Sequence, residues 1–214
     1  MVVFFQRDFS SAVLISSINL SMLFIAGIDK KQIRVLFLIA LSGLLLKFFF
    51  MPNVSDSKNF QDARLSGYMS GGDIQQNNAM DEIGRGAFLI PDIGSSKGKV
   101  LYIAQAHTDF IYTITAAELG LLGVIVVFGG FIMILIRGIQ IVRKSKDLFG
   151  MFLAMGITFN LTFYFMVHVA YNIGLFPTTG LPLPFISYGG SHMLINFSQI
   201  GLLLSVAYKI KNER

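Results

Sequence analysis

The sequence predicts an all-α membrane protein, a polytopic bundle of about five transmembrane helices with one long extracytoplasmic loop. Hydrophobic residues make up 54% of the 214 residues, charged residues make up only 14%, and the mean hydropathy is +0.66. The chain contains five apolar runs, each close to the roughly 20 residues that a helix needs to cross about 30 Å of hydrocarbon. A soluble core does not need so much apolar sequence, so composition and segment length together indicate the membrane class.

The predicted spans follow one another with connections of very different lengths. They cover residues 11–28, 33–51, 110–136, about 148–169 and 193–208. The connection at residues 52–109 is 58 residues long, rich in Ser, Asn, Asp and Gly, and too long for a passive turn. We expect residues 1–214 to form a single membrane domain in which residues 52–109 are the extracytoplasmic loop.

Lys and Arg orient the chain, because short cytoplasmic loops carry an excess of these residues. Residues 29–34 contain three, residues 137–147 contain four and the C-terminal tail contains three, whereas residues 171–192 contain none. The basic segments and the C-terminus are therefore expected in the cytoplasm, and the loops at 52–109 and 171–192 outside. This topology explains the net charge of +5, so a nucleic-acid partner is not expected.

The same orientation places the N-terminus outside, although residues 1–10 lack the basic and apolar regions of a signal peptide. We therefore expect the chain to be the C-terminal part of a larger polytopic protein.

Some kinds of chemistry are excluded by residue type. Cysteine is absent, which removes disulfides, thiolate catalysis and cysteine-ligated metals. His107 and His168 are not part of an HExxH or similar spacing, so helix interfaces are expected for them rather than metal ligation. No metal-ligating residues are predicted.

Two carboxylates stand out at the third span. Asp109 follows His107 and Thr108 at its start, and Glu118 lies nine residues further along, about 13 Å deeper if the helix is straight. Carboxylates held at or within a bilayer are costly and often functional. The alternatives are structural: Asp109 or Thr108 could cap the helix, and Glu118 could make a buried contact.

The expected structural partners of Glu118 are His168 and Lys47.

The outer loop at residues 171–192 holds three of the five prolines and several glycines. It could be a simple connector broken by Pro and Gly. However, Ser187, Tyr188, Gly189 and Gly190 combine hydroxyls with flexible amides, which suits sugars or phosphates. We expect this loop, the segment ending in Asp109, and the N-terminal QRDFSS to converge on one outer face, where irregular backbone usually lines a cavity.

Several motifs carry a resemblance to a known family. They are HTDF at 107–110, ELGLLG at 118–123, TGLPLPFISYGGS at 179–191, QRDFSSAVL at 6–14, FQDAR at 60–64 and GRG at 84–86. Together they resemble the FtsW/RodA/SpoVE family of bacterial cell-wall polymerases, also called SEDS proteins. The GRG motif and its spacing to HTDF are more similar to the FtsW branch, and the resemblance covers essentially the whole chain.

The resemblance implies a peptidoglycan glycosyltransferase that polymerises lipid II on the outer face of the bacterial cytoplasmic membrane, in cell division or elongation. Asp109 would be the catalytic base on the acceptor hydroxyl. For Glu118, the residue pattern itself favours a supporting intramembrane role. A divalent cation, Mg or Mn, is implied as a cofactor. The implied partners are membrane lipid, lipid II and a class B penicillin-binding protein. The expected substrate-binding residues are Arg64 and Arg85 on the pyrophosphate, with His107, Thr108, Ser187, Tyr188, Gly189 and Gly190.

The chain also departs from the family pattern. Ile103-Ala104-Gln105 replaces Leu-Pro-Glu, Ala117 replaces the first residue of a glutamate pair, Ile90-Pro91-Asp92 replaces a Gly-x-Gly, and His192 replaces a Ser. A truncated or diverged polymerase is therefore expected. Two other classes stay open, a lipid-linked substrate transporter or flippase using Glu118, His168 and Lys47, and a non-catalytic scaffold for a penicillin-binding transpeptidase.

Overall fold

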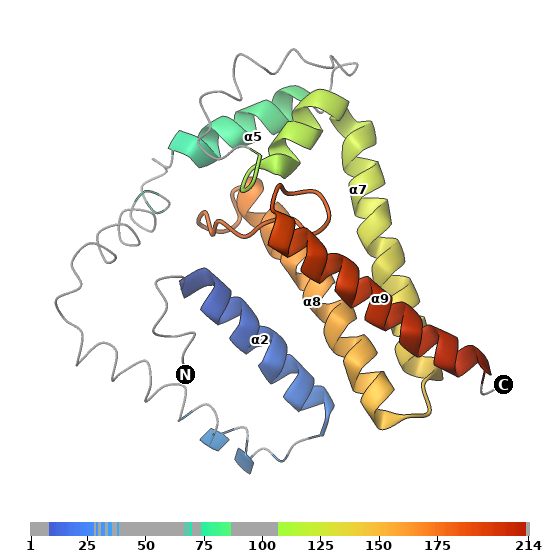
Figure 1. Ribbon diagram of the computed structural model, residues 1–214. Coiled ribbons are helices and arrows are strands. Elements are labelled where there is room, and N and C mark those ends of the chain that lie inside the picture. The colour runs from blue at the N-terminus through green and yellow to red at the C-terminus, as the bar shows by residue number, and fades with distance from the viewer. Residues whose placement is uncertain are drawn as a thin grey trace. The chain divides into compact units, whose positions relative to one another are not determined.

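The computed structural model describes residues 9–27, 74–86 and 107–212, together with eight isolated positions between residues 29 and 69. The chain forms two compact units, Met1–Met69 and Ser70–Arg214. The described elements are all helices, which confirms the predicted all-α class for this part of the chain. They are α2 (Phe9–Ile25) in the first unit, and α5 (Ile74–Gly86), α7 (Ile111–Lys144), α8 (Leu148–Asn172) and α9 (Gly190–Asn212) in the second (Figure 1).

Helix α2 corresponds to the first predicted span. Most of its side chains are apolar, and two of its polar ones turn back onto the helix: Ser17 Oγ donates to the Val13 carbonyl at 2.7 Å and Asn19 Nδ2 to the Ile15 carbonyl at 2.8 Å. Such bonds satisfy polar groups where no water is present. The helix ends just before Gly27, which has a φ of +78°. Most of the second predicted span, residues 33–51, lies outside the described residues.

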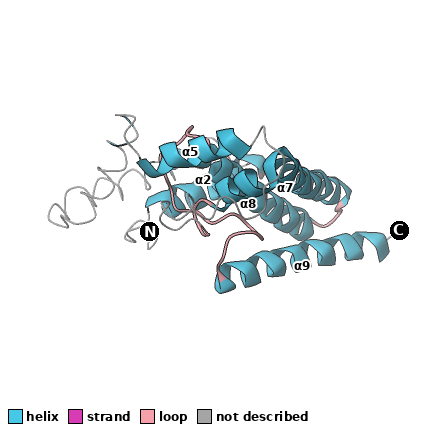
Figure 2. Ribbon diagram, turned by 90° about the horizontal axis from the view of Figure 1, so that it is seen from above, coloured by secondary structure: helices cyan, strands magenta, loops and turns pink. Residues whose placement is uncertain are grey.

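Helices α7, α8 and α9 are long and apolar enough to cross a membrane, in agreement with the last three predicted spans. Residues 145–147 join α7 to α8, so these two helices are antiparallel neighbours (Figure 1). They pack through the stacked rings of Phe131 and Phe165, whose centroids are 4.1 Å apart. Helix α9 lies to one side of α7 and α8 (Figure 2), with Leu203 and Val206 among its few buried residues.

Helix α7 is not one straight span. Gly120 has φ +60° and ψ −153°, which breaks the helix nine residues after its start. The turns before Gly120 lie beside α5, and the rest of α7 then runs along α8 (Figure 1). The break follows Glu118, so the third predicted span is not one straight helix, while the expected depth of Glu118 relative to Asp109 stays a prediction.

The long predicted loop contains helix α5, which packs on α7 and α8. Gln76 of α5 is 3% exposed, and its Nε2 donates to the carbonyls of Tyr171 at 2.6 Å and Phe176 at 2.7 Å. Met80 lies against Gly174, where its sulfur is 2.5 Å from the position that a Cβ would take. Helix α5 thus holds the end of α8 and the start of the following loop.

Candidate active site

The HTDF segment meets the Pro-rich loop in the second unit. The Tyr188 N–H donates to the His107 carbonyl at 3.2 Å, and Ser187 Oγ donates to the Thr108 carbonyl at 2.7 Å. Asp109 Oδ2 is 3.4 Å from the position that a Cβ on Gly180 would take. Residues some 70 to 80 positions apart in the sequence therefore form one site, and the Asp109 carboxylate lies beside the Pro-rich loop at Gly180.

The end of α8 fixes the backbone of Asp109. Tyr171 Oη donates to the Asp109 carbonyl at 2.5 Å, and Asn172 Nδ2 lies 3.4 Å from the same oxygen. Asn172 is itself held, because its Nδ2 also donates to the His168 carbonyl at 2.8 Å and its Oδ1 accepts from Thr113 Oγ1 at 2.8 Å. The side chains of Tyr171, Asn172 and Thr113 are all buried. Asp109 is therefore positioned by side chains whose own geometry is fixed.

His168 joins this group to the Pro-rich loop. Its ring is fully buried, and Nδ1 lies 2.7 Å from the Leu181 carbonyl and 2.8 Å from Tyr171 Oη. Because a carbonyl oxygen only accepts, Nδ1 carries the proton and donates it to Leu181. Nε2 has no hydrogen-bond partner within the described residues. The prediction of an interface role for His168 agrees with this geometry, whereas the expected contact with Glu118 is not among the bonds of its ring.

The Pro-rich loop has a positive φ at two positions, Gly180 and Phe185. Gly180 has φ +68°, which only glycine adopts at little cost. Phe185 has φ +66°, an uncommon value for a bulky residue, and its ring packs against Phe197 of α9 with centroids 5.7 Å apart. The Ser187 hydroxyl stabilises the turn between them by accepting from the Leu183 N–H at 2.7 Å. The loop is therefore a shaped element and not a passive connector.

Asp109 and Thr108 both precede the N-cap position of α7. The N-cap residue of α7 is Phe110, which makes no side-chain capping bond, and the first turn contains no acidic residue. Phe110 instead packs edge-to-face on Tyr171, with ring centroids 6.1 Å apart. Asp109 therefore lies one residue before the N-cap, and a structural role at the start of α7 stays an alternative to a catalytic one.

The predicted substrate-binding residues have different surroundings. His107, Tyr188 and Gly190 are exposed, Tyr188 by 83%, and Thr108 and Gly189 are half-buried. Ser187 is only 1% exposed, so its hydroxyl joins two segments and does not face solvent. Arg64 and the N-terminal QRD lie outside the described residues. Arg85 is in α5, but its side chain also lies outside them.

Glu118 is half-buried, two residues before the break at Gly120. Its other expected partner, Lys47, lies outside the described residues. Glu118 belongs to the same short helical segment as Thr113, at the end of the bundle where the site lies (Figure 1).

The described side chains do not include a group suited to hold a metal ion. Within the described ranges, no three His, Asp or Glu side chains come close enough to hold a metal ion. The divalent cation implied by the resemblance therefore remains a sequence-based expectation, and no chemical step is assigned to it.

Sequence reasoning missed the residues that position Asp109, namely Tyr171, Asn172, Thr113 and Gln76. One signal was present: His168, Tyr171 and Asn172 occur at spacings i, i+3 and i+4, which places three polar side chains on one face of an apolar helix.

Comparison with known proteins identifies the family. A family model for FtsW, RodA and SpoVE, described as "Cell cycle protein", matches residues 1–212. The chain belongs to the FtsW/RodA/SpoVE family. Among curated FtsW/RodA/SpoVE proteins, a "Probable peptidoglycan glycosyltransferase FtsW" from Geobacter metallireducens is 34% identical over 212 residues, which are 96% of this chain and 55% of that protein.

Other comparisons give the same result. The protein of the same name from Coxiella burnetii is 34% identical over 216 residues, covering 97% of this chain and 56% of the relative. A solved structure described as "Structural coordination of polymerization and crosslinking by a peptidoglycan synthase complex" matches with a TM-score of 0.69 and 25% identity, over 94% of this chain and 56% of that chain. The chain thus spans about half the length of the FtsW/RodA/SpoVE proteins that it matches.

Proposed function

We propose that this chain carries the catalytic part of a peptidoglycan glycosyltransferase that polymerises lipid II in cell division or elongation. The observation that supports it most is the attachment of Asp109: two side chains of α8 bind its backbone oxygen, and its carboxylate lies against Gly180 of the Pro-rich loop. Catalytic groups need such fixed positions, because a small displacement greatly lowers the rate.

In the proposed reaction, Asp109 accepts the proton of the acceptor sugar hydroxyl. The hydroxyl oxygen then bonds to the anomeric carbon of the donor, and the bond to undecaprenyl pyrophosphate breaks. A general base must reach the hydroxyl within hydrogen-bonding distance, and a half-buried carboxylate beside the exposed His107 and Tyr188 is suited to this. Arg64 and Arg85 are proposed to bind the pyrophosphate, since guanidinium groups bind such oxygens bidentately.

The proposed location is the bacterial cytoplasmic membrane, with the site outside and the C-terminus in the cytoplasm. A class B penicillin-binding protein is the proposed partner. The similarity to a chain of a peptidoglycan synthase complex that coordinates polymerization with crosslinking supports this partner.

A transporter has less support. It was expected to use His168 in a pathway, but the His168 ring is fully buried and bonded to the loop at Leu181. No described feature specifically favours the scaffold.

The test uses a chimera, because the chain covers 55% of the Geobacter metallireducens relative. The part of that relative outside the match is joined to residues 1–214, and the purified chimera is given fluorescent lipid II. We expect glycan chains from the parent, and a loss of at least about 100-fold for Asp109→Asn, the usual contribution of a general base.

Asp147→Asn is the matched control, because Asp147 lies at the opposite end of α8 and should leave the rate unchanged. Undiminished polymerisation by Asp109→Asn would contradict the role of Asp109. A parent chimera that moves labelled lipid across the bilayer without lengthening glycan would favour the transporter instead.

A further inference from the structure

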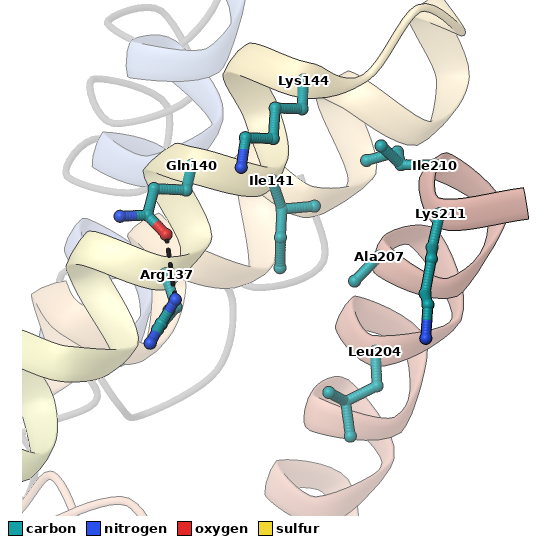
Figure 3. Close-up of a pocket in the computed structure, with 8 residues that line it drawn as sticks. All are labelled: Arg137, Gln140, Ile141, Lys144, Leu204, Ala207, Ile210 and Lys211. Atoms are coloured by element: carbon teal, nitrogen blue, oxygen red, sulfur yellow. Dashed lines mark hydrogen bonds between the residues drawn. The ribbon is translucent and has the colours of Figure 1, made fainter. Parts of the chain in front are cut away.

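A second surface with a chemical character of its own lies at the other end of the second unit. The α7–α9 groove is a cavity of about 390 Å³ lined by Arg137, Gln140, Ile141 and Lys144 of α7 and by Leu204, Ala207, Ile210 and Lys211 of α9 (Figure 3). Its size is in the range of ligand sites. Nothing in the proposed glycosyltransfer reaction uses it.

The walls and the edge of the groove differ in polarity. Ile141 faces Leu204, Ala207 and Ile210 across the gap, whereas Arg137 and Lys144 lie on one side and Lys211 on the other (Figure 3). The lining contains three cations and no acidic residue. The groove is therefore apolar inside and positive at its edge.

These cations have no opposite charge within the part of the chain that the structure describes. Lys209 pairs with Asp147 at 3.1 Å, but Arg137, Lys144 and Lys211 form no ion pair with any described residue. Arg137 Nη1 donates to Gln140 Oε1 at 3.3 Å, and this partner is neutral. The groove has the charge complementary to an anion.

Arg137 lies deeper than an ordinary basic residue of a cytoplasmic loop. It directly follows the apolar run of α7 at residues 121–136 and precedes the end of the helix at Lys144 by seven residues, about 10 Å along the axis. A cation at this depth is costly unless an anion or water reaches it.

We propose that the α7–α9 groove binds an anionic phospholipid of the cytoplasmic leaflet, with the phosphate against Arg137, Lys144 and Lys211 and an acyl chain against Ile141, Leu204 and Ala207. Basic pockets between transmembrane helices on the cytoplasmic side are known to bind anionic headgroups. A free anion would not need the apolar walls, and an apolar protein segment would leave three cations uncompensated. An anionic phospholipid would supply both a negative charge for the cations at the edge and an apolar chain for the walls.

The test measures lipid binding by the full chain in non-ionic detergent, using native mass spectrometry with dioleoylphosphatidylglycerol or dioleoylphosphatidylcholine. We expect tighter binding of phosphatidylglycerol, and a loss of about 25-fold for Arg137→Gln with Lys211→Gln, since each surface cation contributes about fivefold. The matched control, Arg143→Gln with Lys146→Gln, removes the same charges from the same end without touching this groove, and should lower the affinity clearly less than the groove variant.

A second variant tests the apolar walls with the cations intact. Ala207→Phe should fill the groove and weaken phosphatidylglycerol binding, and inorganic phosphate should not compete with the lipid. Equal losses in the two charge variants, equal binding of phosphatidylcholine, or displacement by inorganic phosphate would overturn the proposal. So would a dimer of the full chain that Ala207→Phe abolishes, because a second copy would then occupy the groove.

Discussion

At the scale of single residues, Tyr171 connects more of the candidate site than any other side chain described above. Its hydroxyl lies 2.5 Å from the Asp109 carbonyl, 2.9 Å from the Leu181 carbonyl and 2.8 Å from His168 Nδ1. A phenol has one proton to donate, so the His168 proton is needed for the second carbonyl. Tyr171 and His168 together satisfy two buried oxygens that come from different segments.

Replacing Tyr171 by Phe should therefore weaken the site without opening a large cavity. The variant removes the shorter of the two bonds to the Asp109 carbonyl and leaves the longer one from Asn172. We expect the free energy of unfolding in detergent to fall by about 0.5–1.5 kcal/mol, the net contribution of one hydrogen bond, and polymerisation by the chimera to slow. The control is Tyr208→Phe, which alters a tyrosine that is 67% exposed and should change neither quantity.

At the scale of helices, the contact between α7 and α8 depends on one small residue. A Cβ on Gly138 would collide with Thr158 Oγ1 and would lie 2.7 Å from Thr158 Cβ. Close helix contacts in membranes generally require small residues. Gly138 therefore sets how closely the two helices approach.

Gly138→Ala should force the helices apart. We expect a loss of about 1–3 kcal/mol in the free energy of unfolding, as in other overpacked cores, measured by chemical denaturation in detergent. Gly129→Ala is the matched control on the same helix, because a Cβ there meets nothing within 4 Å. Equal stability of the two variants would show that the helices do not pack as closely as described.

The start of α8 is sensitive to pH through Asp147. This carboxylate accepts from Lys209 Nζ at 3.1 Å and caps the N–H groups of Phe149 and Gly150. The hydrogen bond from Lys209, followed by that from Phe149, lowers the pKa of Asp147 below its usual value. The resulting stabilisation is present above the ordinary carboxyl pKa and is lost as the pH falls through the lowered one.

Asp147→Asn removes this charge and keeps a capping side chain. We expect a small decrease in melting temperature at pH 7, small because both partners are exposed, and a difference that shrinks below about pH 4. Melting curves of both proteins across this range check it. A difference that grows on acidification would have the wrong sign for a lowered pKa.

The helices differ in how well the sequence predicts them. The bounds of α8 and α9 were expected within a few residues, because long apolar runs determine them. The break in α7 was not expected, since Gly120 occurs in an apolar run with further glycines and has no local signal for a positive φ. Helix α5 was also missed, because it lies in a polar stretch and its position depends on distant partners such as the Tyr171 carbonyl.

The candidate site was also predicted only in part from the sequence. Asp109 and the Pro-rich loop were predicted to meet, because topology and motif resemblance both indicated it. The roles of Tyr171, Asn172 and Ser187 were not predicted correctly, because hydrogen bonds across 60 to 80 residues depend on tertiary packing.

At the scale of the whole molecule, the two ends of the second unit have opposite chemistry. The carboxylate of Asp109 and the Pro-rich loop lie at one end, and the basic residues of the α7–α9 groove lie at the other. Short basic connections favour the cytoplasm. The arrangement therefore predicts that the candidate site faces the outside.

The absence of cysteine makes this orientation easy to measure. Single cysteines at Tyr188, which is 83% exposed, and at Arg143, also exposed, are treated with a membrane-impermeant maleimide. Tyr188→Cys should react in intact spheroplasts, and Arg143→Cys only after lysis. The reverse pattern would invert the proposed topology and would move both the glycosyltransferase site and the lipid groove to the other leaflet.

The length of α8 links the site to the thickness of the bilayer. Its 25 residues extend about 37 Å, more than the roughly 30 Å of hydrocarbon, so the helix must tilt in a thin membrane. His168, Tyr171 and Asn172 lie in its last turns and hold the backbone of Asp109 and the loop. Changes in acyl-chain length should thus alter the tilt of α8 and, through these bonds, the position of the Asp109 carboxylate.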